Sequence, residues 1–197
     1  MMISKLIIIK VSIINERIFL MDEKIKIEGE KIFLTPMTLD DAEIFVKWRN
    51  SDYVMSRFFI KEPFTVEGQR NWIKNKVMTD EVAQFVVWDK ADNVRIGSTY
   101  LINFDRNNKK CEYGMLIGEE QYAGGGRGSE MARLTSDFGL QQLGFNKVYC
   151  RIMADNIASV KACEKGGFSI EGLFKEDIWV ENKPFDEYFL AKFKKSE

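Results

Sequence analysis

The sequence predicts an α/β fold with one mixed, mostly antiparallel central sheet flanked by helices. Short stretches in which apolar and polar residues alternate, as in half-buried strands, recur along the chain. Between them lie segments with apolar residues at helical spacing, and several begin at a Thr or Asn that can cap a helix. No internal repeat or low-complexity tract interrupts the pattern, and 197 residues suit a single domain.

The first half of the chain predicts two helices among three strands. Residues 31–35 alternate as a strand, and Thr38 caps the helix that follows and runs through residue 50, with Asp41 placed to complete a capping box. Thr65 caps a second helix. The next two strands are joined by residues typical of turns, and they cover residues 84–88 and 96–101.

The second half adds a glycine-rich loop, two helices and three strands. The later helix is short, because Asn156 is a natural N-cap and Gly166-Gly167 ends it. In chain order we expect a strand at 111–117, a helix at 127–143 that Gly144 ends, a strand at 147–153, the short helix and a last strand at 188–193.

The most informative stretch is Gln121-Tyr122-Ala123-Gly124-Gly125-Gly126-Arg127-Gly128-Ser129-Glu130. Its four glycines leave a loop without side chains where a helix begins, so free backbone N–H groups and the positive end of the helix dipole can face an anion. A surface hinge is the simpler interpretation. A P-loop is excluded because no Gly-Lys-Ser/Thr follows, and the dinucleotide fingerprint fits only loosely, with Ser129 in the third glycine position. The loop therefore predicts a site for a phosphate-bearing ligand.

Composition excludes several classes of function. The net charge of −1 argues against a broad nucleic-acid surface. The three cysteines have no Cys-x-x-Cys spacing, which favours reduced thiols in the cytoplasm over disulfides or a zinc site. The chain has no histidine, so Ser-His-Asp triads, Cys-His nucleophiles and His-rich metal sites are excluded. Acid–base chemistry must fall to Glu, Asp, Tyr, Lys, Cys or water, and we expect no metal.

The first twenty residues are apolar but carry Lys10, Glu16 and Arg17. The run is too short and too charged to span a membrane, and no signal-peptide cleavage site follows it. We expect residues 1–20 to be an upstream extension or an added edge strand, and residues 21–197 to form the functional domain.

Two motifs together resemble those of the GNAT N-acetyltransferase superfamily. Gln/Arg-x-x-Gly-x-Gly/Ala is matched by Gln121, Gly124 and Gly126. The resemblance covers roughly Lys31 to Lys194, and the most similar subgroup is the Rim-type ribosomal-protein N-acetyltransferases, with polyamine and amino-sugar acetyltransferases as relatives. The second motif, Asn-x-x-Ser…Glu-Lys-x-Gly-Phe, is matched by Asn156, Ser159, Glu164, Lys165, Gly167 and Phe168.

The resemblance implies a GNAT-like acyl-CoA N-acyltransferase fold with acetyl-CoA as cosubstrate. Its diphosphate would lie over the N–H groups of the glycine loop, and its pantetheine arm would pair like an extra strand where the sheet opens. Asn156 and Ser159 would approach from the short helix, although capping alone would explain Asn156. The expected binding residues are Met115, Leu116, Ile117, Gln121, Tyr122, Gly124, Gly125, Gly126, Arg127, Gly128, Ser129, Asn156 and Ser159.

The implied reaction is direct attack by a primary amine, from a peptide N-terminus, a polyamine or an amino sugar, in a ternary complex. Deprotonating a lysine-like amine at pH 7 costs about 4–5 kcal/mol, against about 1 kcal/mol for an α-amino group. Glu112 matches the family's Ala-Glu-x-Gly glutamate and is the expected base, with a solvated carboxylate as the alternative. Many members of the family carry a tyrosine where this chain has Cys163. The group that protonates the leaving thiolate is therefore left open among Cys163, Ser159 and water. For Cys163, a purely structural role as a buried thiol is an equal alternative.

On the acceptor side, the resemblance points to Trp48, Arg49, Asn50 and Phe59. Aromatic residues at such spacing are more often core, whereas a buried arginine needs an anionic partner. An acidic C-terminal segment either attracts a cationic acceptor or is a solvated face, and it comprises Glu176, Asp177, Glu181, Asp186 and Glu187. The competing functions are a non-catalytic CoA-binding regulatory module and a purely structural domain. The expected partners are acetyl-CoA and an amine, with a homodimer left open and no nucleic acid or membrane.

Overall fold

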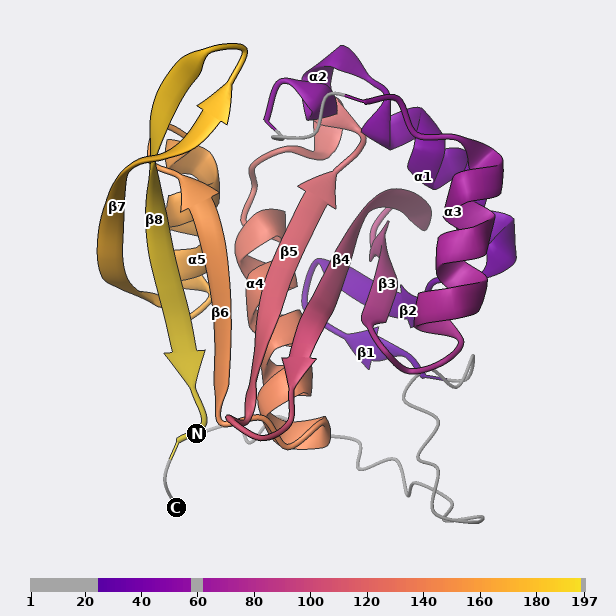
Figure 1. The fold of residues 1–197 in the computed structure, drawn as a ribbon. Helices are drawn as coiled ribbons and strands as arrows, with labels where there is room; N and C mark the ends of the chain where they lie inside the picture. Colours follow the sequence, from indigo (N-terminus) through magenta and orange to yellow (C-terminus); the bar gives the residue numbers. More distant parts are fainter. Residues whose placement is uncertain (1–24, 58–61, 196–197) are drawn as a thin grey trace.

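The structure is a computed structural model that describes residues 25–57 and 62–195. The described strands form one sheet in the order β1-β2-β3-β4-β5-β6-β8-β7 (Figure 1). Neighbouring strands are antiparallel except for β5 and β6, which are parallel, so the predicted mixed, mostly antiparallel sheet is confirmed. The strands are β1 (Ile27–Glu28), β2 (Ile32–Pro36), β3 (Ala83–Asp89), β4 (Val94–Asp105), β5 (Lys110–Ile117), β6 (Lys147–Met153), β7 (Ser169–Val180) and β8 (Lys183–Phe193).

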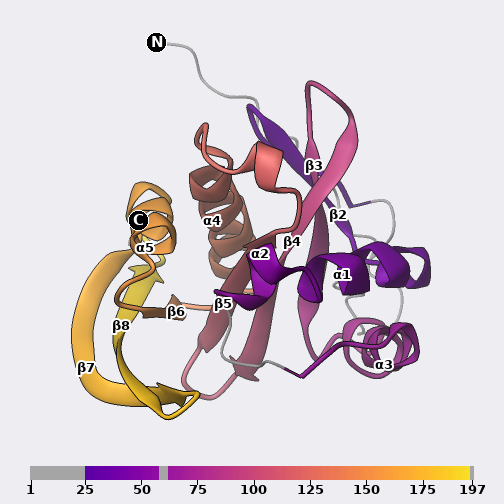
Figure 2. The same cartoon turned by 90° about the horizontal axis from the view of Figure 1, so that it is seen from above.

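The helices cover both faces of this sheet. Figure 2 shows α1, α2 and α3 on one face and α4 and α5 on the other. A π-helical turn continues α3 and another continues α4, at Ile73–Val77 and Phe138–Gln142. The helices are α1 (Ala42–Arg49), α2 (Asp52–Met55), α3 (Val66–Trp72), α4 (Arg127–Asp137) and α5 (Ile157–Lys165), with 3-10 turns at Leu39–Asp41 and Glu120–Tyr122.

The helix starts follow the predicted caps. The Thr38 backbone N–H donates to Asp41 Oδ2 at 2.9 Å, which is one half of the capping box. Thr65 Oγ1 accepts from the Gly68 N–H at 3.1 Å, and Asn156 Oδ1 accepts from the Ser159 N–H at 3.3 Å. These local signals therefore placed α1, α3 and α5 correctly, whereas α2, which begins after the N-cap Ser51, was not predicted.

The sequence did not predict β1 or β7, and the predicted bounds of β4 and β8 were too short. Most of β7 is exposed, because it is the edge strand beyond β8 and neither of its faces is fully covered. Its residues consequently lack the alternation of apolar and polar side chains that reveals a half-buried strand. The edge strand suggested for residues 1–20 lies outside the described residues.

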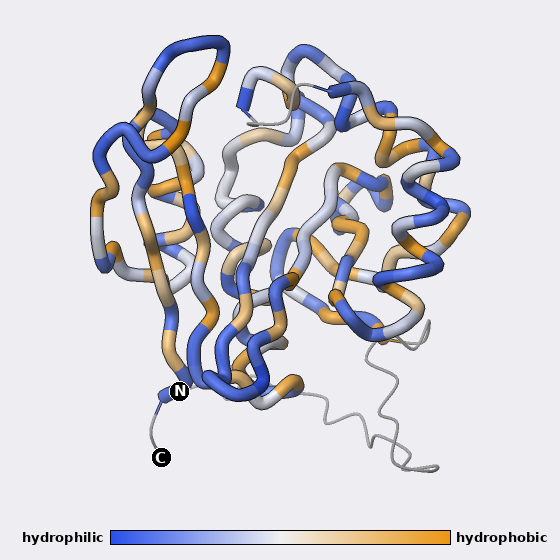
Figure 3. Tube along the Cα trace, in the orientation of Figure 1, coloured by the Kyte–Doolittle hydropathy of each residue, from blue (hydrophilic) through white to orange (hydrophobic). Residues whose placement is uncertain are grey.

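Apolar side chains pack on both faces of the sheet. On the α4 and α5 face the core includes Phe85, Met131 and Phe145, and on the opposite face it includes Trp48 and Val86. Figure 3 shows hydrophobic runs along the central strands, whereas the turns at the ends of β4–β5 and β7–β8 are hydrophilic. Both layers thus hold the central strands rigidly in place.

The sheet opens between β5 and β6. Their pairing stops after Lys110↔Lys147, Cys111↔Val148 and Glu112↔Tyr149. Beyond this point the strands separate (Figure 1), so residues 113–117 of β5 have no partner in β6. This edge leaves backbone groups available to a ligand, as the pairing expected for a pantetheine arm requires.

Candidate active site

The glycine loop and the start of α4 form one wall of the site. Gly124 and Gly126 have φ of 83° and 87°, in the left-handed region that favours glycine. A Cβ at Gly124 would meet nothing within 4 Å, so the space over the loop is open. Because α4 begins at Arg127, its first N–H groups lie beside this space. The arrangement can hold an anion such as a diphosphate.

An ion pair fixes the start of α4, next to the loop, to the sheet. Arg127 Nε donates to Asp89 Oδ2 at 2.6 Å, and the Asp89 side chain is only 1% exposed. Burial raises the pKa of Asp89, but hydrogen bonds from the Asp92 N–H and from Arg127 outweigh it, and the net pKa is lowered. The Arg127 side chain is therefore bound to the end of β3, and only its backbone N–H can face a ligand over the glycine loop.

Glu130, in the first turn of α4, fixes the loop on its other side. Its buried carboxylate accepts from the backbone N–H groups of Lys31 at 2.9 Å and Ile32 at 3.2 Å, and also from the Glu30 N–H. The Lys31 ammonium donates to the Gly125 carbonyl. Sequence reasoning missed these residues, because the contacts join positions about a hundred residues apart.

A cavity of about 1360 Å³ extends from this loop through the opening of the sheet to the face covered by α1 and α3. It brings together most of the residues expected from the sequence. Those that line it are Arg49, Glu112, Met115, Leu116, Ile117, Gly124, Gly125, Gly126, Gly128, Ser129, Asn156, Ser159 and Cys163.

Five expected residues do not line the cavity: Trp48, Asn50, Gln121, Tyr122 and Arg127. Trp48 is buried, and its indole N–H donates to Glu119 Oε1 at 2.8 Å. The Asn50 amide bonds both the N–H and the carbonyl of Phe64 at 2.8 Å. Trp48 and Asn50 therefore contact the residues around the cavity and do not face into it. Phe59 lies outside the described residues.

Glu112 lies at the point where β5 and β6 part, on the face covered by α1 and α3. Its Oε2 accepts from Asn103 Nδ2 at 2.8 Å and from the Tyr149 hydroxyl at 3.4 Å. Tyr149 stacks on Phe189 with 5.0 Å between ring centroids. Burial, and then the charge of Glu112, raise the pKa of Tyr149. Sequence reasoning did not find Asn103 or Tyr149, because only the strand register brings them to Glu112.

A buried arginine, Arg49, and Tyr100 line the same cavity as this carboxylate. Arg49 is 5% exposed, its guanidinium lies 4.4 Å from the centroid of Phe64, and burial lowers its pKa. Tyr100 lies across Gly114, where any Cβ would overlap its ring. Burial raises the pKa of Tyr100. This part of the cavity can therefore offer an acceptor the guanidinium of Arg49 and the neutral hydroxyl of Tyr100.

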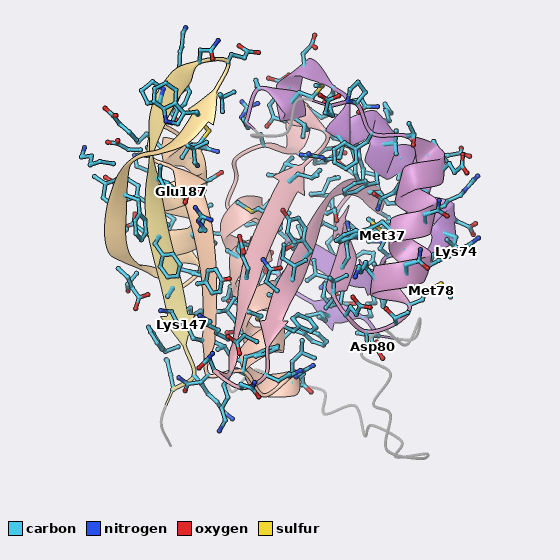
Figure 4. The ribbon with its side chains drawn as sticks, in the orientation of Figure 1. Met37, Lys74, Met78, Asp80, Lys147 and Glu187 are labelled. Atoms are coloured by element: carbon cyan, nitrogen blue, oxygen red, sulfur yellow. The ribbon has the colours of Figure 1, made fainter. Side chains whose placement is uncertain are left out.

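Two of the five acidic C-terminal residues line the cavity, Asp177 and Glu187. Arg151 lies between them, with Nη2 at 2.8 Å from Asp177 Oδ2 and Nε at 2.5 Å from Glu187 Oε2. Burial raises the pKa of Glu187, and Arg151 offsets this only in part. In Figure 4, Glu187 lies toward the tip of the β7–β8 hairpin and Lys147 toward the other end of the sheet.

Cys163 lies in α5, with its Sγ 3.8 Å from that of Cys150. Both thiols line the cavity, and a hydrogen bond with Cys163, then burial, raise the pKa of Cys150. All three cysteines are free, and burial raises the pKa of Cys111 to about 12. Within residues 25–57 and 62–195, no three Cys, Asp or Glu side chains are grouped to hold a metal ion. No helix in those ranges is long and apolar enough to cross a membrane.

Comparison of the sequence with known proteins identifies the family to which this chain belongs. Residues 31–169 match the family described as "Acetyltransferase (GNAT) domain". A curated relative, the probable N-acetyltransferase YjcK of Bacillus subtilis, is 25% identical over 172 residues, which are 84% of this chain and 95% of the relative.

Two solved structures share the fold. Ribosomal-protein-S5-alanine acetyltransferase from Vibrio fischeri has a TM-score of 0.77 at 19% identity, covering 87% of this chain and 98% of the other. Spermidine N-acetyltransferase from Vibrio cholerae, in complex with CoA and spermine, has a TM-score of 0.75 at 20% identity, covering 84% and 97%. The matched family spans more than half of the sequence, and the chain therefore belongs to the GNAT family as an acetyl-CoA-dependent N-acetyltransferase.

Proposed function

We propose that this enzyme transfers an acetyl group from acetyl-CoA directly to a primary amine while both substrates occupy the cavity. The observation that carries the proposal is the continuity of the cavity from the glycine loop, past the free edge of β5, to Glu112 and Arg49. Holding two reactants in contact supplies much of the rate enhancement when the acyl donor is already an activated thioester.

In this proposal the cofactor half of the cavity binds acetyl-CoA with backbone groups. The N–H groups from Gly124 to Ser129 bind the diphosphate, and the free edge at residues 115–117 pairs with the pantetheine amides. The open space over Gly124 supports this, because a side chain there would occupy the volume of the phosphates. Asn156 and Ser159 line the same half from α5.

Glu112 acts as the base for the acceptor amine. A protonated alkylamine must lose a proton before its nitrogen can attack, at a cost of about 4–5 kcal/mol at pH 7. The bonds from Asn103 and Tyr149 hold the carboxylate at the junction of the two strands. Asp177 and Glu187 share one cation, Arg151, so the two carboxylates leave one net negative charge at the cavity, which favours an acceptor that carries positive charge beyond the reacting amine.

The test is turnover of acetyl-CoA against a panel of spermidine, a peptide with a free N-terminal alanine, and glucosamine. Release of free thiol together with an acetylated product identified by mass spectrometry is the expected result. Binding of CoA without thiol release for any amine would instead favour the non-catalytic CoA-binding module. Absence of CoA binding would contradict both functions.

A further inference from the structure

The part of the cavity covered by α1 and α3 is lined by a cluster of polar side chains. Arg49 is 5% exposed, Gln69 4% and Gln84 3%, and all three line the cavity together with Tyr100, which is partly exposed. These four residues are called the polar cluster. Buried polar groups are nearly always hydrogen-bonded, so the partners that these side chains already have indicate what kind of ligand the cluster could bind.

Strand pairing and one hydrogen bond bring the polar cluster together. Gln84 of β3 lies directly opposite Tyr100 of β4. Gln84 Oε1 accepts from Trp72 Nε1 at 2.9 Å, and Trp72 lies one turn after Gln69 in α3. Burial raises the pKa of Tyr100, and the nearby charge of Arg49 opposes this. The cluster therefore lies between α1, α3 and the sheet, on the face that carries the proposed base.

Two members of the polar cluster keep hydrogen-bonding capacity for a ligand. The Gln69 amide nitrogen donates to Met37 Sδ at 3.5 Å, a weak acceptor, and within the described part of the chain its oxygen accepts no hydrogen bond. Among the same residues the Tyr100 hydroxyl makes no hydrogen bond either, although Tyr100 keeps surface in the cavity. Gln84 differs, because both ends of its amide are bonded. Gln69 and Tyr100 can therefore donate to a bound group.

The polar cluster carries one positive charge. Its cation is the Arg49 guanidinium, whose five N–H groups can serve several partners at once and which lies 4.4 Å from the ring centroid of Phe64. The other three members are neutral. Arg57 and Glu62 also line the cavity, but both are exposed and their charges are opposite. A guanidinium beside hydroxyl and amide donors suits a carboxylate, because charge-assisted hydrogen bonds to a carboxylate are strong.

The other end of the cavity has the opposite charge. The strand order places Tyr100 of β4 on one side of Glu112 in β5, and Glu187 of β8 and Asp177 of β7 on the other. Asp177 and Glu187 share Arg151, which leaves one net negative charge there. A ligand that lies across these strands with its amine at Glu112 therefore meets positive charge on the β4 side and negative charge on the β8 side.

Resting on the proposed function, we infer that the acceptor is an amino acid whose carboxylate is bound by Arg49, with Tyr100 and Gln69 as additional donors. Its amine reaches Glu112, and a basic side chain extends the match to the acidic end of the cavity. A polyamine fits less well, because it brings positive charge to both ends and offers the polar cluster no anion. The acceptor class is therefore a basic amino acid such as lysine.

The test compares L-lysine with cadaverine, which is lysine without its carboxylate. In the wild type, kcat/KM for lysine should exceed that for cadaverine roughly 10- to 100-fold, the range expected for hydrogen bonds to a charged group. Arg49→Gln should abolish this preference by lowering kcat/KM for lysine while leaving that for cadaverine nearly unchanged. A wild-type enzyme that prefers cadaverine, or an Arg49→Gln variant that loses both activities equally, would overturn the inference.

Tyr100→Phe tests the same site without removing a buried charge. It should lower kcat/KM for lysine about 3- to 10-fold and leave cadaverine unaffected. Arg70→Met is the matched control, because Arg70 is exposed on α3 and does not line the cavity, and its ratio of lysine to cadaverine should equal that of the wild type. If Arg49→Gln does not fold, Tyr100→Phe decides, and an unchanged ratio in that variant would overturn the inference.

Binding separates this inference from the proposed function. Isothermal titration of lysine and of cadaverine into the CoA-bound protein requires no turnover. Lysine should bind more tightly than cadaverine to the wild type, and Arg49→Gln should bind the two equally. If the wild type shows this difference but acetylates no amine, the proposed function fails and the carboxylate site stands. Equal binding of the two ligands to the wild type, or binding of neither, would overturn the inference even if an amine is acetylated.

Discussion

At the scale of single residues, the proposed chemistry depends on how the carboxylate of Glu112 is held. Glu112 is the last β5 residue paired with β6, and it accepts hydrogen bonds from Asn103 at 2.8 Å and Tyr149 at 3.4 Å. Tyr149 is in turn fixed by stacking on Phe189. A base held by two neighbours keeps one orientation toward the acceptor, which efficient proton transfer requires.

Glu112→Gln should reduce kcat/KM for an alkylamine about 10²- to 10⁴-fold at pH 7, with little change in the affinity for acetyl-CoA. The loss should be greatest at acidic pH and shrink as the pH approaches the amine pKa of about 10.4, because the amine then deprotonates without help. The pH–rate profile checks this, with Glu120→Gln as a control on an exposed residue outside the cavity. A loss of the same size at every pH would exclude Glu112 as the base.

At the scale of elements, the glycine loop, which we propose as the diphosphate site, is held by hydrogen bonds on both sides. Arg127 ties it to β3 through Asp89, and Glu130 ties it to the turn before β2. The backbone N–H groups at the start of α4 are thereby fixed before any ligand arrives. A fixed site loses less conformational entropy on binding than a mobile loop.

Gly126→Val should weaken CoA binding more than about 100-fold, because the side chain enters the space that the phosphates need. Part of any effect will come from backbone strain, since φ at Gly126 is 87°. Gly144→Val is the matched control, with φ of 74° and no atom within 4 Å of its Cβ. It should be destabilised similarly but bind CoA normally by isothermal titration. Retained CoA affinity in Gly126→Val would contradict the placement of the diphosphate.

Arg127→Met should lower the free energy of unfolding by about 1.5–3 kcal/mol at pH 7, the usual range for a hydrogen bond to a charged group. The folded-state pKa of Asp89 lies below its ordinary 3.8, so its contribution is complete above that pH and is lost as the pH falls through the folded pKa. The difference between variant and wild type should therefore shrink as the pH falls below 3.8.

Urea unfolding at pH 7 and pH 3 measures this difference. Arg70→Met is the control, because Arg70 makes a solvent-exposed ion pair with Glu43 at 3.1 Å. Such pairs contribute only about 0–1 kcal/mol. If Arg127→Met and Arg70→Met lower the free energy of unfolding equally at pH 7, the contact between Arg127 and Asp89 stabilises the protein no more than an exposed ion pair does.

At the scale of the whole molecule, the proposed function divides two tasks between the two faces of one sheet. The α4 and α5 face carries the glycine loop, and the face with α1 to α3 carries Glu112 and Arg49. The opening between β5 and β6 is the passage between them (Figure 1). A ligand that fills this passage contacts both halves and should stabilise the entire fold.

CoA at about 100 times its dissociation constant should stabilise the protein by about 2.7 kcal/mol. For a chain of this size that corresponds to an increase of about 5–10 °C in Tm. Differential scanning fluorimetry checks it, with inorganic phosphate at equal ionic strength as the control. No shift with CoA would favour the purely structural domain.

Much of this organisation could be predicted from local sequence signals. Thr38, Thr65 and Asn156 marked helix starts, and the glycine run marked the loop, because each acts within a few residues. The surroundings of Glu112 could not be predicted, because Tyr149 reaches it only through the pairing of two distant strands. Trp48 was expected in the acceptor site, but its ring packs against Gly118 and its indole bonds to Glu119, contacts that no local pattern reveals.

The irregular pairing within the β7–β8 hairpin has an evolutionary consequence. Between Phe174↔Glu187 and Ile178↔Phe185, three β7 residues face one β8 residue, and Glu176 takes a φ of 52°. Such bulges accommodate extra residues locally, while β8 keeps its alignment with β6. Insertions or deletions here would reshape the rim beside Asp177 and leave the CoA half untouched. In the proposed function, the acceptor end of the cavity can therefore change between descendants of this gene while the acetyl-CoA end is kept.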